Sequence, residues 1–177
     1  MNIAEHIYNF RGTISIIDYF FYVLAEYSSM FFIISFAIIV FLEILKSKKI
    51  LYVSKYLSII FITYTVNQLL RRLVERERPF VVNDFSSMIE HSASYSFPSN
   101  HAAMSFIVAL TIYRLNRKLG RCFLVLAGLV SLSRVYVGVH YPSDIIAGAV
   151  LAILIFKIME LFFDKNKFHL FRGELSD

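Results

Sequence analysis

Residues 133–144 read SRVYVGVHYPSD, and this stretch joins the end of one long apolar run to the start of the next. It places an arginine, Arg134, a histidine, His140, and a carboxylate, Asp144, between two segments that are each long enough to cross a bilayer as a helix. Charged side chains at a membrane boundary are costly unless they do chemistry there. The stretch therefore predicts a helical membrane protein with a functional site where two spans meet.

The composition agrees with a membrane protein. Of the 177 residues, 58% are hydrophobic, which is more than an ordinary soluble domain contains. The apolar runs predict five spans, at about residues 22–45, 51–73, 99–113, 122–139 and 142–163. Residues 1–21 mix polar and aromatic residues, and they predict an interfacial amphipathic helix or a weak first span. We expect an all-α polytopic membrane helix bundle of five to six spans that forms a single domain over residues 1–177.

The net charge of +5 is divided among short loops. Because the positive residues do not gather on one face, no nucleic-acid partner is predicted, whereas anionic lipid or phosphate suits the charge. Basic residues follow the first, third and fifth predicted spans, at residues 46–49 and 114–121 and in the C-terminal tail. An even number of spans separates these segments, so all three fall on one side, which the positive-inside rule makes cytoplasmic.

Four polar segments then fall together on the opposite, outer side of the membrane. They are Arg71 to Pro79, Pro98 to His101, Ser133-Arg134 and His140 to Asp144. This convergence follows from counting spans alone. The arginines of residues 71–78 run against the positive-inside rule, so we expect them to serve function rather than topology.

Each segment alone also has a simpler explanation. The arginines could bind lipid headgroups, Ser99 could only cap a helix, and Arg134 could extend its charge to the interface. His140 could be an interfacial ring and Asp144 an acidic residue at a helix start. Two histidines and an aspartate could also bind zinc, but the nearby arginines would repel a cation. Four such segments on one face favour an anion site, and we expect no metal and no cofactor.

The residue types suit phosphate chemistry. A guanidinium presents forked donors that match phosphate oxygens, and the predicted helix start at Pro98 to His101 presents backbone N–H groups. Asp144 follows His140 by four residues, so its carboxylate can hold the imidazole in one tautomer. Such a pair suits a histidine nucleophile.

The chain resembles the type 2 phosphatidic acid phosphatase (PAP2) superfamily in the spacing of three segments: Arg71-x6-Arg78-Pro79, Pro98-Ser99-x-His101 and Ser133-Arg134-x5-His140-x3-Asp144. The sequence around these residues, at Glu77 to Phe80 and at Val137 to Pro142, is similar to bacterial undecaprenyl-diphosphate phosphatases of the bacitracin-resistance type. Two positions depart from the family pattern, because Arg71 replaces a lysine and Asn100 replaces a glycine.

The resemblance implies a PAP2 or haloperoxidase-like helical core that works without a metal. His140 would attack phosphorus and form a phosphohistidine, and Asp144 would orient the ring. His101 would protonate the leaving oxygen and then deprotonate the hydrolytic water. The phosphate would be held by Arg71, Arg78, Ser99, Asn100 and Arg134.

We therefore expect a lipid phosphatase of the bacterial plasma membrane that removes the terminal phosphate of undecaprenyl diphosphate on the outer face, with its C-terminus in the cytoplasm. Its partners would be the bilayer and a polyprenyl or glycerolipid phosphate. Phosphatidylglycerophosphate and phosphatidic acid are alternative substrates, and a non-catalytic lipid-phosphate binding or transport protein is the alternative of a different class. A haloperoxidase would share these residues, but the membrane character argues against it. The preferred lipid and the oligomeric state stay open.

Overall fold

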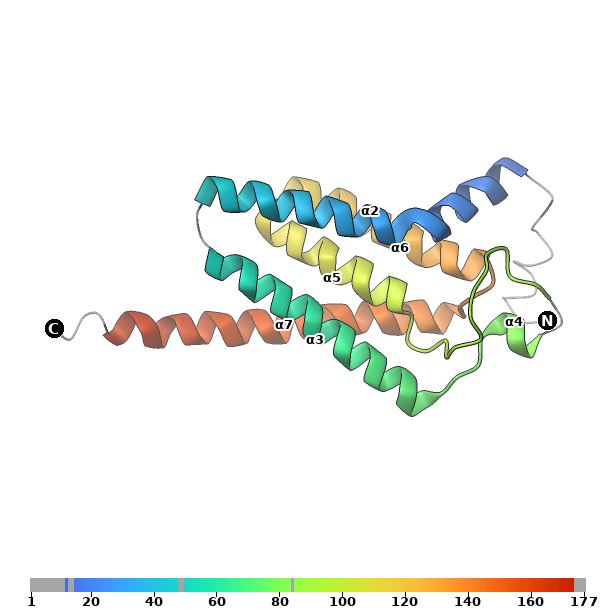
Figure 1. The fold of residues 1–177 in the computed structure, drawn as a ribbon. Helices are drawn as coiled ribbons and strands as arrows, with labels where there is room; N and C mark the ends of the chain where they lie inside the picture. Colours follow the sequence, from blue (N-terminus) through green and yellow to red (C-terminus); the bar gives the residue numbers. More distant parts are fainter. Residues whose placement is uncertain (1–11, 13–14, 48–49, 84, 174–177) are drawn as a thin grey trace.

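The computed structural model describes residue 12 and residues 15–47, 50–83 and 85–173, and over these residues it is helical (Figure 1). This confirms the predicted all-α class. In the described part, five long helices and one short one follow in the order α2 (Ser15–Ser47), α3 (Ile50–Val74), α4 (Pro79–Val82), α5 (Asn100–Leu115), α6 (Arg117–Tyr136) and α7 (Pro142–Gly173).

The long helices run back and forth between two ends of an elongated bundle (Figure 1). One end holds the C-terminal end of α2, the start of α3, the α5–α6 turn and the far end of α7. The other end holds α4, the long connection from α4 to α5 and the turn between α6 and α7. The four polar segments of the sequence therefore meet at one end of the bundle, as span counting predicts.

Three helices in the described part are long and apolar enough to cross a membrane: Ser15–Leu45, Arg117–Tyr136 and Pro142–Phe163. Large apolar side chains also face outward, among them Phe61, Val125 and Ile146, which are each more than 60% exposed. Helix α5 has 16 residues and therefore extends about 24 Å, which is less than the thickness of a hydrocarbon core. The helices identify a membrane protein, and the count of five to six spans stays a prediction.

The first long helix starts earlier than predicted. Helix α2 begins at Ser15, so residues 15–21 continue into the first apolar run instead of forming a separate interfacial helix. Asp18 accepts a 2.6 Å hydrogen bond from the Tyr136 hydroxyl, and Phe21 stacks on the same tyrosine ring at 4.3 Å. These contacts hold the start of α2 against the end of α6. Residues 1–11, 13 and 14 lie outside the described residues, and the expectation for them is unchanged.

The predicted basic loop at residues 114–121 is also shorter than expected. Asn116 alone separates α5 from α6, because its N–H donates to the Ile112 carbonyl while its side chain accepts from Leu119 N at 3.0 Å. A Cβ at Gly120 would lie 2.1 Å from Tyr113 Cα, so only glycine permits this close approach. The basic residues of this segment therefore lie mostly in the first turns of α6.

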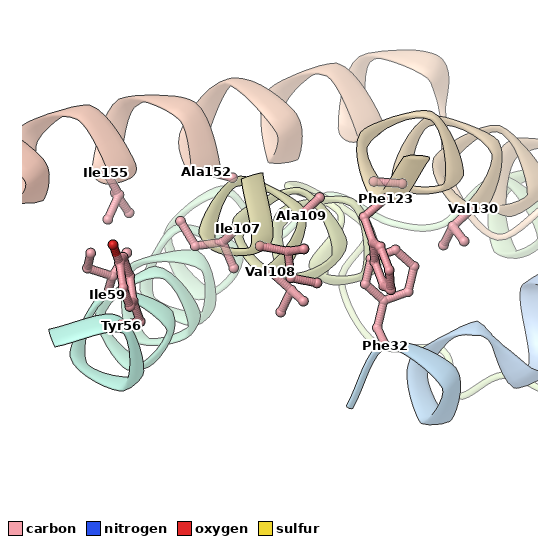
Figure 2. Packing of buried hydrophobic residues seen from close by; sticks show 12 residues of the cluster. Phe32, Tyr56, Ile59, Ile107, Val108, Ala109, Phe123, Val130, Ala152 and Ile155 are labelled. Atoms are coloured by element: carbon pink, nitrogen blue, oxygen red, sulfur yellow. The ribbon is translucent and has the colours of Figure 1, made fainter. Parts of the chain in front are cut away.

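Helix α5 lies at the centre of the bundle and contacts all four of the other long helices. Its side chains Ile107, Val108 and Ile112 are buried in the main apolar cluster (Figure 2). Phe32 and Phe123 belong to the same cluster, and their rings join α2 to α6 in an edge-to-face contact at 5.5 Å (Figure 2). A central buried helix gives the first turn of α5, where Ser99 to His101 lie, a rigid position.

A glycine sets how closely α7 approaches that first turn. A Cβ on Gly148 would lie 2.6 Å from the Ser99 carbonyl oxygen and 3.1 Å from Ala103 N. Real side chains do not approach backbone atoms so closely, so the packing of α7 on α5 requires glycine here. This contact brings two of the predicted site segments together.

Candidate active site

The two arginines of the first segment meet through the fold of the chain and not through a shared helical stripe. Helix α3 ends at Val74, after which Glu75 adopts a positive φ of 50° and Arg78 is extended before Pro79. The side chains of Arg71 and Arg78 nevertheless converge on the Ser94 hydroxyl, at 3.4 Å and 3.2 Å. Arg71 also donates to the Tyr95 carbonyl. The connection from α4 to α5 therefore brings a serine between two predicted phosphate ligands.

The turn between α6 and α7 holds His140 by its backbone. The N–H groups of Val139 and His140 both donate to the Arg134 carbonyl, at 3.1 Å and 3.2 Å. The chain can fold back in this way because Gly138 adopts a φ of 84°, which is the left-handed region that favours glycine. The turn joins the Arg134 segment to the His140 segment, although the two side chains point to different partners.

The His140 ring is buried, and its two nitrogens face different groups. Nδ1 lies 3.4 Å from Asp144 Oδ2, and Nε2 lies 3.3 Å from Arg78 Nη1. If Nδ1 carries the proton, Nε2 has a free lone pair directed at the arginine. Burial and the charges of Arg78 and Arg134, opposed by the contact with Asp144, lower the pKa of His140 to about 4. The ring is therefore neutral at neutral pH, as a nucleophile requires.

Asp144 is fully buried and accepts several hydrogen bonds. Its Oδ2 accepts from Tyr141 N at 2.9 Å, and its Oδ1 accepts from Arg76 Nη1 at 2.8 Å. The backbone carbonyl of Asp144 also accepts from Ser99 N at 3.0 Å, which links the start of α7 to the start of α5. The predicted pairing of Asp144 with His140 is present, and the structure adds a cation on the other carboxylate oxygen.

Arg78 and Arg134 are buried cations with unused donors. Arg78 donates to the Val139 carbonyl at 2.7 Å, and Arg134 donates to the Ala25 carbonyl at 2.8 Å. The Nε–H groups of both side chains are buried and have no hydrogen-bond partner among the described residues. Burial, together with the charges of Arg71 and Arg134, lowers the pKa of Arg78 to about 10, so this guanidinium stays charged at neutral pH. Buried donors without partners are costly and favour a bound anion.

The first turn of α5 carries the remaining predicted residues. The Ser99 hydroxyl accepts from Ala102 N at 3.4 Å, which is the capping role considered from the sequence. Asn100 Oδ1 accepts from the buried Asn67 side chain of α3 at 3.3 Å. His101 lies near enough to Arg78, Arg134 and His140 for their charges to act on its ring. The predicted ligands thus lie at one end of the bundle, and direct side-chain contacts join only some of them.

Several residues of this site were not predicted from the sequence. They are Asn67, Arg76, His91 and Ser94, and none of them lies at a position that the family spacing marks. Burial lowers the pKa of His91 to about 4, and the charges of Arg78, Arg134 and Arg71 act in the same direction. Arg76 alone had a visible signal, because it is a further charge in the Glu75 to Arg78 segment. The others depend on how the connection between α4 and α5 folds over the site.

An apolar cavity of about 520 Å³ lies beside the site, between α2, α3 and α5. Asn100 and His101 lie among its lining residues, and most of the others are apolar, including Phe36, Ile60 and Met104. A second cavity of about 530 Å³ between α2 and α6 contains none of the predicted site residues. The first cavity therefore places Asn100 and His101 beside an environment suited to a hydrocarbon chain.

Comparison with protein families gives one match that covers most of the chain. A family model described as the PAP2 superfamily matches residues 52–168, which contain every predicted site residue.

Among curated proteins, similarity is found to the "Bacitracin transport permease protein BcrC" of Bacillus licheniformis, with 32% identity over 75% of this chain and 65% of that protein. It is also found to the "Undecaprenyl-diphosphatase BcrC" of Bacillus subtilis, with 34% identity over 51% of this chain and 47% of that protein. The chain thus matches less than two thirds of the length of either relative.

Among solved structures, the fold is similar to the "first transmembrane PAP2 type phosphatidylglycerolphosphate phosphatase" of Bacillus subtilis. The TM-score is 0.71 and the identity 25%, over 92% of this chain and 83% of that one. The helical arrangement therefore has a counterpart in a known membrane protein.

Proposed function

Because the chain belongs to the PAP2 superfamily, we propose that it is an integral membrane phosphatase that removes the terminal phosphate of undecaprenyl diphosphate through a phosphohistidine intermediate. The observation that carries this proposal is the buried row of contacts from Arg78 through His140 to Asp144. It combines a cation for the phosphate, an imidazole nitrogen with a lone pair and a carboxylate that orients the ring.

The chemistry has two steps. The Nε2 lone pair of His140 forms a bond to phosphorus while the bond from phosphorus to the bridging oxygen breaks, and His101 gives its proton to that oxygen. Water then attacks the phosphohistidine, His101 takes up the water proton, and the phosphorus–nitrogen bond breaks to release inorganic phosphate. A bound phosphate supplies the negative charge that favours the protonated form of His101 among the arginines.

The arginines stabilise the charge on the transferred phosphoryl group. Arg71, Arg78 and Arg134 would donate to its oxygens, and the free Nε–H groups of Arg78 and Arg134 support this assignment. The N-terminal turn of α5, at Asn100 and His101, would add backbone N–H groups. This arrangement supplies positive charge from side chains, so the proposal predicts full activity in EDTA.

Two observations bear on the lipid and on its side of the membrane. The apolar cavity beside His101 suits the hydrocarbon part of a lipid substrate, and the name of the Bacillus subtilis relative supports undecaprenyl diphosphate. Basic residues at the opposite end of the bundle, Arg117, Lys118 and Arg121, favour a cytoplasmic location for that end. The proposal therefore includes a bacterial plasma-membrane protein with its site on the outer face and its C-terminus in the cytoplasm.

A lipid panel tests the reaction and the substrate together. Purified protein in detergent is given undecaprenyl diphosphate, phosphatidylglycerophosphate or phosphatidic acid, with and without EDTA, and inorganic phosphate is measured. We expect the highest kcat/KM for undecaprenyl diphosphate, no effect of EDTA and background release by His140→Ala. A preference for phosphatidylglycerophosphate would favour the second candidate substrate, which the solved relative's description supports. Turnover by His140→Ala would exclude the phosphohistidine mechanism.

A second candidate is a non-catalytic lipid-phosphate binding or transport protein, which the name of the Bacillus licheniformis relative favours. Such a protein would bind the same lipids, but it would release no inorganic phosphate. Wild-type protein and His101→Ala would then give equal rates at the level of buffer, whereas the phosphatase proposal predicts a large difference.

The side of the membrane is tested by labelling. A Ser86→Cys variant in a Cys122→Ser background should react with an impermeant maleimide added to intact cells. Labelling only after the cells are opened would place the site end in the cytoplasm.

A further inference from the structure

Arg76 connects three segments at the site, and among the described residues its side chain contacts none of those assigned to bind phosphate. Its Nη1 donates to Asp144 Oδ1 at 2.8 Å and to Ser143 Oγ at 2.7 Å, and its guanidinium carbon lies 3.9 Å from the centre of the Tyr141 ring. Its backbone carbonyl accepts from Ser96 N at 2.7 Å. One residue thus joins the end of α3, the connection before α5 and the first turn of α7.

The carboxylate of Asp144 is held more firmly by Arg76 than by His140. Its short contacts are with Arg76 and with Tyr141 N, at 2.8 Å and 2.9 Å, whereas His140 Nδ1 lies at 3.4 Å. A buried carboxylate is costly without a counter-charge and hydrogen bonds, and Arg76 supplies both. The hydrogen bonds from Arg76 to Oδ1 and from Tyr141 N to Oδ2 therefore fix the direction in which the Asp144 carboxylate faces the imidazole.

The shape of the arginine is used as well as its charge. A planar guanidinium can lie on the face of Tyr141 while its edge donates to a carboxylate, which a lysine ammonium cannot do. The Arg76 side chain is 36% exposed, so it covers the Asp144 pocket from the solvent side. Arg78, in contrast, is buried beside His140 and keeps a free donor.

We propose that Arg76 is a positioning residue that fixes Asp144, and through it the orientation and tautomer of the His140 imidazole. This inference rests on the phosphatase function proposed above and adds a residue that the family spacing does not mark. The charged groups that face His140 are Asp144 on its own turn, Arg78 from the α3–α4 connection, Arg134 from α6 and His101 from α5. Arg76 acts on this set by neutralising part of the Asp144 charge.

The direction in which removal of Arg76 changes the protonation of His140 can therefore be predicted. Without its counter-charge, the full negative charge of Asp144 acts on His140 and favours the protonated imidazole. The neutral, reactive form is then lost at a higher pH, and the acid limb of the pH profile of kcat/KM moves upward. Because the side-chain contacts of Arg76 are with Ser143, Asp144 and Tyr141 and not with the residues assigned to the phosphate, we expect KM for the lipid to stay close to the wild-type value while kcat falls.

The test compares Arg76→Gln and Arg76→Lys with Arg72→Gln, a matched loss of charge at the exposed neighbouring arginine. We expect Arg76→Gln to lower kcat by about 10- to 100-fold, the range typical when an orienting partner is lost. KM should change less than threefold, and the acid limb should move upward by about one pH unit. Arg76→Lys should restore the position of the acid limb but only part of kcat, and Arg72→Gln should match wild type.

The outcomes separate this inference from the function on which it rests. An increase in KM with unchanged kcat would mean that Arg76 binds phosphate, and a lower melting temperature with an unmoved acid limb would mean a purely structural role; either result overturns the proposal. The imidazole titration is also followed by NMR of histidine-labelled protein without substrate, with His140→Ala for assignment. The midpoint of His140 should rise in Arg76→Gln even if wild-type protein releases no phosphate, and an unchanged midpoint would contradict the inference.

Discussion

The two ends of the bundle both hold charged side chains that connect the same helices, but they use them differently. At the end with the basic turns, Glu160 of α7 lies 2.6 Å from Lys55 of α3 and 3.1 Å from Arg114 of α5. These side chains are 12–55% exposed, and each oxygen of the carboxylate faces a cation. This cluster neutralises its own carboxylate, so its role is to join helices.

At the site end the charges are buried and unbalanced. Arg78, Arg134, His140 and Asp144 are each at most 1% exposed, and Arg71 and Arg76 add positive charge nearby. One buried carboxylate therefore faces several guanidinium groups, and two of these keep a donor without a partner among the described residues. The comparison teaches how a ligand site differs from a structural ion cluster, because the site leaves buried positive charge and donors that suit an additional anion.

The largest effect that would break this comparison is expected at Arg134. Arg134→Leu removes a buried cation with a free donor, and we expect a loss of at least about 100-fold in kcat/KM, the scale of a lost transition-state donor. The variant should still accumulate in the membrane fraction. If it fails to accumulate, the hydrogen bond from Arg134 to the Ala25 carbonyl is structural, and the site end would resemble the Glu160 end.

The next effect concerns how helix packing positions the site. Gly148→Val would force atoms against the Ser99 carbonyl, which lies 2.6 Å from the position of an added Cβ. We expect a lower melting temperature and a loss of about 10-fold or more in activity, because displacement of the helix start misplaces His101 and Asp144. Gly128→Val is the matched control, since a Cβ at Gly128 meets nothing within 4 Å. Equal behaviour of the two variants would contradict the role of close α5–α7 packing.

The pH dependence of kcat/KM tests whether the site end is buried, and the change in rate expected here is smaller than for the two variants above. Burial lowers the pKa of His140 to about 4, so the neutral nucleophile persists well below the ordinary value of about 6.5. Between pH 7 and pH 5.5 we expect kcat/KM to change less than about threefold, with the acid limb at lower pH. An acid limb centred near pH 6.5 would mean that the ring titrates as an exposed histidine does.

The smallest effect on activity is expected at Glu160. Glu160→Gln removes the carboxylate that Lys55 and Arg114 share, but partly exposed ion pairs contribute little to stability. We expect activity within about twofold of wild type and a decrease of a few degrees in the melting temperature. A large loss of phosphate release without unfolding would show that the two ends are coupled and that the comparison is wrong.

Part of the site could be predicted because it depends on local rules. Pro79 excludes helix at Arg78, and the structure shows this residue extended. Pro142 begins α7, and the four-residue spacing brings Asp144 next to His140. The number of apolar runs predicts that the four polar segments lie at one end of the bundle, because each spanning helix reverses the direction of the chain.

The other part depends on contacts between distant segments, which no local pattern encodes. Ser94 lies between Arg71 and Arg78 only because the connection after α4 returns across the end of α3. The start of α2 at Ser15 depends on the contact between Asp18 and Tyr136, which are 118 residues apart. The one-residue turn at Asn116 was missed for another reason, because a run of basic residues favours a loop until the capping and the close approach at Gly120 are known.

The Ser94 hydroxyl and the Tyr95 carbonyl occupy N–H groups of Arg71 and Arg78 that are also suited to phosphate oxygens. An anion that takes these same N–H groups must displace them. The connection before α5 is therefore a tethered competitor, present at a high effective concentration because it is part of the same chain. The segment that shapes the site therefore also competes with any anion for the N–H groups of Arg71 and Arg78.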